Sequence, residues 1–226
     1  GFAGSASAAT LTATGDILIR AASLDRVVGS VGVFTYGAIS STLGNVVIDG
    51  RGVTGVDLLA PVTAGSGSTI RSLRISGYSD RGGAVSGGGY GIYVRAAGVL
   101  TATGEVQLNA YSNSSTYAMY VVAPTRSTVL GNITFSAADS AGSDSIIGMR
   151  VDGSMTATNG SITLQGSTFA DGVVSPAPGT PVKGRSYGVR LYGTGQTLSA
   201  TGDITILGLS TVGAGSGVEA IGGYDI

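Results

Sequence analysis

The sequence contains no cysteine, no histidine and no tryptophan. The lack of cysteine excludes disulfide bonds and thiolate chemistry, and it fits a bacterial export route on which stray disulfides would hinder passage. Without histidine or cysteine, a general base or nucleophile would have to be a carboxylate, a lysine or a tyrosine. We therefore predict neither a cofactor nor a metal centre.

Charge and long apolar runs are also scarce. Twelve basic residues stand against thirteen acidic ones, and no run of like charges could steer a polyanion or an anionic membrane. We therefore expect no nucleic-acid partner. No stretch approaches the roughly 18 apolar residues that cross a bilayer, so no transmembrane segment is expected. The N-terminus lacks the features of a signal peptide, and an export signal would lie outside this sequence.

Glycine and apolar residues are plentiful. The chain has 40 glycines and 42% apolar residues, which are spread along its whole length. It is rich in turn formers and β-branched residues and poor in strong helix formers. The apolar content exceeds that of a disordered glycine-rich linker. This composition predicts an all-β protein with an elongated core.

A repeat organises the sequence. Four segments nearly copy one another, and we call the glycine of each copy the second anchor of its unit. An upstream first anchor recurs at Gly1, Gly32, Gly55, Gly91, Ala118, Gly148, Gly188 and Gly217. Most of the variation in unit length follows the second anchor, so one corner of each coil is free to vary. The copies are Leu11-Thr-Ala-Thr-Gly-Asp-Ile17, Leu100-Thr-Ala-Thr-Gly-Glu-Val106, Met155-Thr-Ala-Thr-Asn-Gly-Ser-Ile162 and Leu198-Ser-Ala-Thr-Gly-Asp-Ile204.

Apolar residues two positions apart recur in each unit, as is typical of strands with one buried face. They form three sets, exemplified by Ile92/Val94, Leu100/Ala102 and Ile133/Phe135. One unit alone buries too little to offset about 1 to 2 kcal/mol of backbone entropy per residue, so the units must stack. We predict a parallel β-helix (β-solenoid) with three strands per coil and about seven coils of irregular length. The glycines between strands are expected to permit the positive-φ conformations that tight corners demand.

Residues 1–226 are predicted to form a single β-helix segment. Gly1 already occupies an anchor position and the last unit breaks off after Gly217. Capping sequences are not evident, so we expect a fragment of a longer repetitive chain. Two long insertions, 77–90 and 167–186, are interpreted as corner loops, which are either recognition elements or tolerated insertions.

The pattern resembles a known family. Gly-Asn-Ile133-Thr, Gly-Ser-Ile162-Thr-Leu and Gly-Asp-Ile204-Thr-Ile, alternating with strands led by Gly or Tyr, are similar to the filamentous-haemagglutinin-like exoproteins of Gram-negative bacteria. The resemblance spans essentially the full chain. It implies a right-handed β-helix rod, two-partner secretion through an outer-membrane transporter, and a role in adhesion or biofilm formation. The family's Asn-Pro-Asn secretion motifs are missing, and autotransporter passengers share the same style of repeat.

Aromatic and arginine side chains provide the candidate binding surface. Outward positions of one strand per coil are predicted to form a column, whose rings and guanidinium groups could stack on sugars or anchor a protein. The same column could simply stabilise neighbouring coils by cross-strand pairing. The column comprises Phe34, Asp57, Tyr93, Tyr120, Arg150, Arg190 and Glu219, with Tyr36, Arg95, Asp152 and Tyr192 two residues on; the first loop adds Tyr78, Asp80, Arg81 and Tyr90.

Catalysis has little support in the sequence. The acidic residues near variable corners form no carboxylate pair at recognisable spacing, and we interpret them as solvated turn residues. Calcium at Asp139 and Asp144 is an open alternative. These aspartates are Asp80, Asp139, Asp144, Asp152 and Asp171.

The sequence as a whole predicts a structural or adhesive rod segment and not an enzyme. The parent would be secreted or displayed on the bacterial surface, where it would contact a glycan or protein of a host cell or another bacterium. The alternative is a carbohydrate-binding or polysaccharide-cleaving β-helix, such as a tailspike or lyase module.

Overall fold

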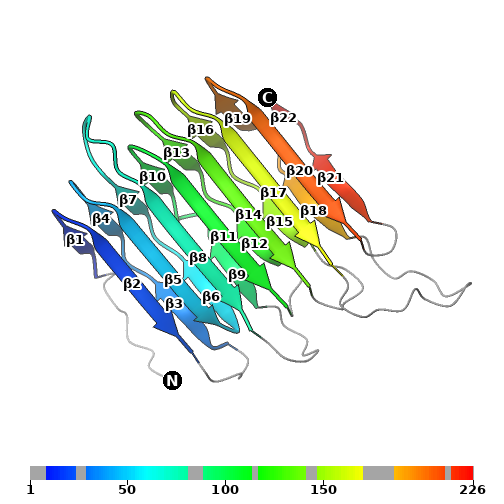
Figure 1. Ribbon diagram of the computed structural model, residues 1–226, viewed down its shortest axis with the longest axis horizontal. Coiled ribbons are helices and arrows are strands. Elements are labelled where there is room, and N and C mark those ends of the chain that lie inside the picture. Colours follow the sequence, from blue (N-terminus) through cyan, green and yellow to red (C-terminus); the bar gives the residue numbers. More distant parts are fainter. Residues whose placement is uncertain are drawn as a thin grey trace, which may run out of the picture.

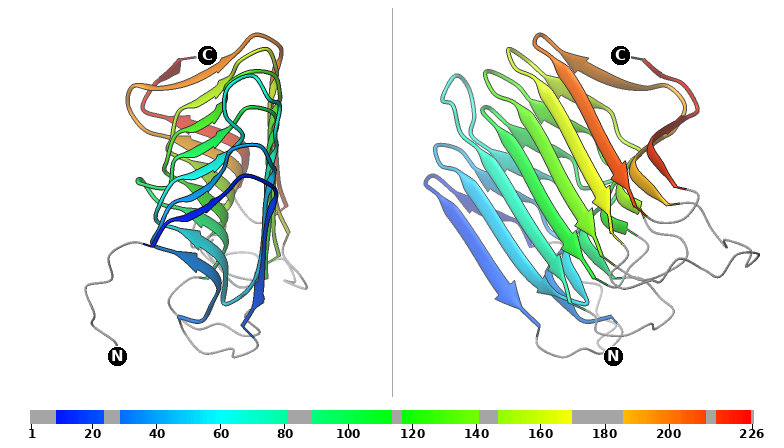
Figure 2. Two further views of the ribbon diagram at one scale, coloured as in Figure 1. Left: turned by 90° about the vertical axis from the view of Figure 1, so that its left-hand side faces the viewer. Right: turned by 45° about the vertical axis from the view of Figure 1, so that its right-hand side comes forward.

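The computed structural model describes residues 9–23, 29–80, 89–113, 117–140, 147–169, 186–211 and 215–225. The regular structure in these residues is entirely β-strand, arranged in three parallel sheets that we call A, B and C. Each coil passes through the sheets in that order, and every strand pairs in parallel with the strand three places along the chain. Figure 1 and Figure 2 show the coils stacked along one axis. The predicted right-handed parallel β-helix with three strands per coil is confirmed.

Sheet A is the narrowest face of the coil. Most of its strands contain three residues, so one side chain per strand points outward. Its eight strands are β1 (Leu11–Ala13), β4 (Ile39–Ser41), β7 (Val62–Ala64), β10 (Leu100–Ala102), β13 (Thr125–Ser127), β16 (Met155–Ala157), β19 (Gln196–Ala200) and β22 (Tyr224–Asp225).

Sheet B is the widest face and sheet C closes the coil. The strands of sheet B are β2 (Ile17–Ala22), β5 (Val46–Gly52), β8 (Leu73–Ser79), β11 (Val106–Ser112), β14 (Ile133–Asp139), β17 (Ile162–Thr168) and β20 (Ile204–Ser210). The strands of sheet C are β3 (Val31–Thr35), β6 (Thr54–Leu58), β9 (Tyr90–Val94), β12 (Tyr117–Val121), β15 (Ile147–Val151), β18 (Tyr187–Tyr192) and β21 (Ser216–Ile221).

The core consists of stacked apolar side chains, as the two-residue spacing predicts. Leu108, Phe135 and Leu164 follow one another in the register of sheet B, and all three are fully buried. Each side chain packs within its own coil and against the coils on either side, at the spacing of about 4.8 Å between paired strands. The stack replaces the compact core that a single coil cannot form.

Most anchor glycines lie where another backbone approaches closely, whereas Gly15 lies in open space. Positive φ angles among the described glycines occur only at Gly29, Gly65, Gly67, Gly193, Gly195, Gly222 and Gly223, none of which is an anchor. All of these glycines lie between strands, so the prediction that glycines between strands permit positive φ at corners is confirmed. A Cβ on Gly91 would meet backbone atoms of Tyr111 and Ala118 at 2.7 to 2.9 Å. The first anchors pack where sheets B and C meet, and the coil that carries Ala118 at this position accommodates a buried methyl group there.

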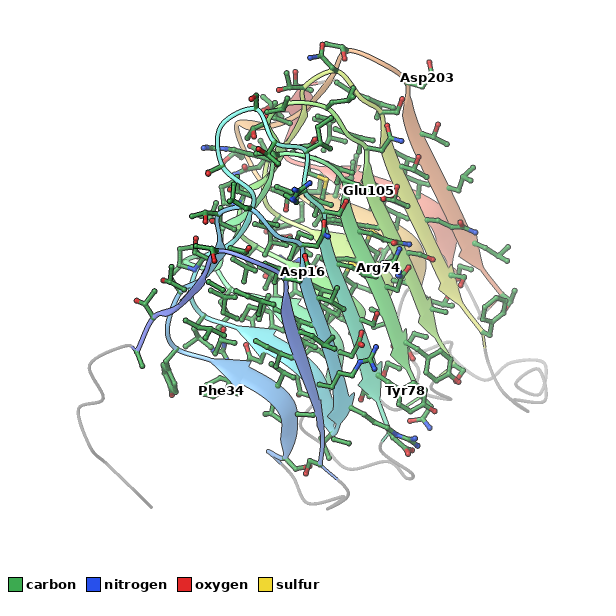
Figure 3. All side chains as sticks on the ribbon, turned by 60° about the vertical axis from the view of Figure 1, so that its left-hand side comes forward. Asp16, Phe34, Arg74, Tyr78, Glu105 and Asp203 are labelled. Atoms are coloured by element: carbon green, nitrogen blue, oxygen red, sulfur yellow. The ribbon has the colours of Figure 1, made fainter. Side chains whose placement is uncertain are left out.

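A polar ladder runs along the corner between sheets A and B and includes several of the residues that follow a second anchor. Asp16 accepts a hydrogen bond from the backbone N–H of Asn45 at 2.7 Å, and Asn45 accepts one from Ser72 at 2.9 Å. Further along, Asn132 accepts from the N–H of Ser161 at 2.9 Å. Each side chain thus satisfies a backbone donor of the next coil. Figure 3 shows Asp16, Glu105 and Asp203 along this corner.

The variable corner lies between sheets B and C. Val53 alone separates β5 from β6, whereas residues 169–186 separate β17 from β18. This corner absorbs most of the variation in unit length, as predicted, but residues 65–72 also lengthen the corner between β7 and β8. Strand β8 continues to Ser79 and β9 starts at Tyr90, so the first predicted loop overlaps both strands; residues 81–88 and 170–185 lie outside the described residues.

The sequence repeat did not identify the second anchor of one coil. Strands β7 and β8 belong to the coil between Gly55 and Gly91, and Arg71 occupies the second-anchor position there because Leu73 pairs with Val46 and Val106. Without a glycine at that point, the motif that locates the other coils is absent. The described part of the chain contains no helix long and apolar enough to cross a membrane.

Candidate binding surfaces

The predicted outward column forms a continuous line on sheet C. Phe34 pairs with Asp57, Asp57 with Tyr93, Tyr93 with Tyr120, and Tyr120 with Arg150. The line continues through Arg190 to Glu219. The sequence therefore identified both the strand and the register of this surface. We call it the Tyr/Arg column.

Tyrosine rings occupy the middle of the Tyr/Arg column. The rings of Tyr93 and Tyr120 are stacked at 5.2 Å between centroids, with planes 4° apart. Tyr90 and Tyr117 start the same two strands, and their rings stack on Tyr93 at 4.7 Å and on Tyr120 at 5.3 Å. Stacked aromatic pairs contribute about 0.5 to 1.5 kcal/mol beyond their buried area. The four rings cover much of one another, which reduces the ring surface left for a ligand.

An ion pair between neighbouring coils engages the first arginine of the column. Arg95 makes two hydrogen bonds to Asp57, at 2.9 and 2.7 Å, and Asp57 is only 5% exposed. Arg95 also lies over the ring of Tyr93, with its guanidinium carbon 4.7 Å from the ring centroid. The hydrogen bonds to Asp57 raise the pKa of Arg95 above its usual value.

A second group of contacts centres on Asp152. This carboxylate accepts two hydrogen bonds from Arg150 and one from the hydroxyl of Tyr120, each at 2.8 Å. Burial, followed by the hydrogen bond to Asp152, raises the pKa of Tyr120 above its usual range. Burial lowers the pKa of Arg150, but its hydrogen bonds to Asp152 and Tyr117 outweigh that effect and raise it. Arg150 also lies over the ring of Tyr192, 4.5 Å from its centroid.

The last members of the column are paired as well. Arg190 forms an ion pair with Glu219 at 2.7 Å and lies over the rings of Tyr187 and Tyr192. Every arginine predicted as a contact on sheet C is therefore already engaged by an acidic residue of the same face. The contacts favour the interpretation that this column stabilises the stack of coils.

The candidate residues of the first loop lie mainly on sheet B. The ring of Tyr78 is stacked on that of Tyr111 in the next coil, with centroids 4.9 Å apart and planes at 14°. Arg51 covers the other side of Tyr78 at 4.8 Å and forms an ion pair with Asp80 at 2.7 Å. Arg81 lies outside the described residues. Tyr90 belongs to the tyrosine cluster of sheet C and not to this group.

A hollow of about 610 Å³ lies on the outer face of sheet B beside these rings. It crosses five neighbouring strands, from β2 to β14. Its floor includes the short polar side chains of Ser76, Asn109 and Ser136, and its edge includes Arg51, Tyr78 and Tyr111. Figure 3 shows Tyr78 and Arg74 on this face, away from Phe34. Apart from Tyr78, the sequence analysis did not identify these residues, and only the register of sheet B brings them together.

A smaller hollow of about 540 Å³ lies on sheet C near the start of the Tyr/Arg column. Phe34, Tyr90 and Tyr93 line it together with the Arg95–Asp57 pair. Such a set of rings around a carboxylate could bind a cation, but the guanidinium of Arg95 already occupies that carboxylate.

The acidic residues differ from the prediction of solvated turns. Asp139 lies in β14 between Ser112 and Thr168, and it is fully buried. The prediction was wrong for Asp139 because β14 continues further than the apolar pattern indicates. Asp80 and Asp152 are engaged by arginines, and Asp144 and Asp171 lie outside the described residues. Within the described residues, no three His, Cys, Asp or Glu side chains gather at a potential metal site.

No protein-family model, no curated protein and no solved structure matches the chain. The class that can be stated is that of the fold, a parallel β-solenoid.

Proposed function

We propose that the chain is a structural and adhesive segment of a secreted or surface-displayed bacterial exoprotein. The observation that carries the proposal is the hollow on sheet B, a concave surface lined by short polar side chains and two tyrosines on a rigid stack of coils. Binding groups held by a rigid scaffold lose little entropy when they engage a ligand. The partner would be a surface glycan or protein, and the parent chain would leave the cell through an outer-membrane transporter.

The regular stack of coils supports a role as a spacer that extends a binding surface away from the cell. Strands of each sheet pair in register from the first described coil to the last, and each coil contacts only its neighbours. Such a solenoid lengthens by one strand spacing per coil without altering the coils already present. A rod of this kind holds a binding surface away from the site at which the parent chain is attached.

Polysaccharide cleavage is the second candidate, and it would use the same hollow. Two carboxyl groups usually flank the bond that a glycosidase cleaves. Asp49 is the carboxylate among the residues that line the hollow, and it is ion-paired with Arg20 at 2.9 Å. This arrangement supports binding more than cleavage, and product analysis separates the two.

The test is retention of cells by the immobilised protein. Beads coated with the chain should retain bacterial or epithelial cells, and beads coated with the variant Tyr111→Ala should retain fewer. Tyr192→Ala, which removes an exposed ring from sheet C, is the matched control and should retain as many as the wild type. Equal retention by uncoated beads would contradict an adhesive function. Release of reducing or unsaturated sugars from a polysaccharide panel would favour the cleaving module instead.

A further inference from the structure

We infer that the hollow on sheet B is a groove for a neutral oligosaccharide, which lies along the axis of the solenoid and stacks on Tyr111. The inference rests on the proposed adhesive function and specifies the chemistry of its ligand. The argument uses the shape of the hollow, the free face of one ring, the polar groups on the floor, and the charges at the edge.

The register of sheet B shapes the groove. Asn109 pairs with Ser76 on one side and Ser136 on the other, so three short side chains form a low row across β8, β11 and β14. Two residues further along the strands, Tyr78 and Tyr111 form a tall row. The hollow therefore runs across the strands, parallel to the stacking axis. Its five strands span roughly 19 Å at about 4.8 Å per strand, which suits several linked sugar rings.

Tyr111 offers the ring face that a sugar requires. Both faces of Tyr78 are covered, by Arg51 on one side and by Tyr111 on the other. Among the described residues, the ring of Tyr111 is covered by Tyr78 on one side only, because its partner in β14 is Ala138, whose methyl group is too short to cover a ring. The hydroxyl of Tyr111 is hydrogen-bonded to that of Ser140 at 2.8 Å. The ring is thus held in place before any ligand arrives.

The floor supplies hydrogen-bonding groups of the right kind. An amide and two hydroxyls both donate and accept, as the hydroxyls of a sugar do. None of the side chains of Ser76, Asn109 and Ser136 forms a hydrogen bond with another described residue, and all three are partly exposed. A sugar ring has an apolar C–H face and a rim of hydroxyls, and it can satisfy Tyr111 and this row at the same time.

The charges at the groove select a neutral ligand. Arg20 pairs with Asp49 at 2.9 Å, and Arg51 pairs with Asp80 at 2.7 Å. Both arginines among the described lining residues are therefore neutralised by a carboxylate of the next coil. An acidic polysaccharide would have to compete with these carboxylates, whereas a neutral one meets no uncompensated charge.

The experiment compares neutral and acidic oligosaccharides. The folded chain is applied to an array that contains neutral glucans, mannans and galactans beside uronic-acid and sulfated glycans, and the affinity for each bound oligosaccharide is then measured by calorimetry. We expect binding of at least one neutral series that strengthens with chain length. Tyr111→Ala should weaken it roughly tenfold or more, and Tyr111→Phe should retain most of it. Asn109→Ala should also weaken it.

The matched control is Gln165→Ala, in the same row of sheet B but outside this hollow. It should bind as the wild type does. Preference for acidic glycans, or binding that Tyr111→Ala and Asn109→Ala leave unchanged, would overturn the inference. Self-association lost in Tyr111→Ala without any glycan binding would overturn it too, since the occupant would then be a second copy. Retention of cells without binding of a neutral glycan would support the adhesive function and contradict only the proposed ligand. Binding of a neutral glycan without retention of cells would support the ligand and contradict the adhesive function.

Discussion

A Cβ atom on Gly77 would lie 2.0 Å from the carbonyl oxygen of Gly91. These two glycines belong to facing strands of sheets B and C, and the same contact recurs between Gly166 and Gly188. The two coils between these pairs carry Ala110 with Ala118 and Ala137 with Gly148 at the corresponding positions, so the close backbone contact belongs to particular coils. Where it occurs, the contact explains a first-anchor glycine that lies within a strand and not in a turn.

The first prediction concerns this contact. Gly77→Ala should lower the free energy of unfolding by about 1 to 3 kcal/mol or more, because the methyl group forces backbone apart and no flexible side chain can yield. Urea unfolding followed by circular dichroism measures the change. Gly15→Ala is the control, since a Cβ there meets nothing within 4 Å; it should change stability by no more than about 1 kcal/mol. Equal effects of the two variants would contradict the close-approach explanation.

The second prediction concerns the internal stack. Phe135 is among the largest fully buried side chains, and truncation to alanine should cost about 3 to 5 kcal/mol through lost burial and the cavity that remains. Leu18 is 58% exposed on the outer face of sheet B, and Leu18→Ala should change stability by about 0.5 kcal/mol or less. Thermal unfolding of both variants tests the inward and outward assignment. A larger loss for Leu18→Ala would show that the alternation has been assigned to the wrong faces.

The third prediction concerns the polar ladder between sheets A and B. Asn132→Ala removes the acceptor for the N–H of Ser161 and should cost about 1 kcal/mol. Asn132→Asp keeps a side-chain oxygen at that position, so it should restore most of the loss. The hydrogen-exchange rate of the Ser161 amide is a local measure of this bond. It should increase in the alanine variant and remain low in the aspartate variant. Unchanged exchange in both would show that the ladder does not protect the corner.

The fourth prediction concerns the pH dependence of stability. Burial and the hydrogen bond to Asp152 raise the pKa of Tyr120, so the folded chain holds this proton where the unfolded chain, with a pKa of about 10, has lost it. The contribution to stability is complete below pH about 10 and declines as the pH rises toward the folded pKa. Stability should therefore fall more steeply above pH 10 in the wild type than in Tyr120→Phe. Identical slopes from urea unfolding at each pH would rule out this role for Tyr120.

The sequence predicted the Tyr/Arg column but not its chemistry. Tyr93 and Tyr120 follow their anchors at the same distance, and in a parallel stack equal distance means equal register. Their ring contact could therefore be predicted. The ion pair between Arg95 and Asp57 could not be predicted. The side chain of Arg95 passes over the ring of Tyr93 and contacts Asp57 in the preceding coil. Which of several neighbouring side chains a long arginine selects depends on rotamers and distances that spacing alone does not contain.

The hollow on sheet B was missed for a related reason. Ser76, Asn109 and Ser136 carry no motif, and each is an ordinary outward residue of its own strand. They form a floor only when three coils lie in register next to the tall row of Tyr78 and Tyr111. The coil that contains Ser76 also has Arg71 in place of a glycine at its second-anchor position, so the repeat pattern did not identify this coil.

By itself, the sequence determined the period, the three strands per coil, the inward residues and the corner that varies, because all of these follow from repeated spacing and two-residue alternation. The tertiary structure decided the rest. It brought glycine backbones of sheets B and C into contact, buried Asp139, joined the arginines to their carboxylates and formed the hollow beside Tyr111. These features depend on which side chains of different coils meet across a strand spacing of about 4.8 Å, and that distance is set only when the coils stack.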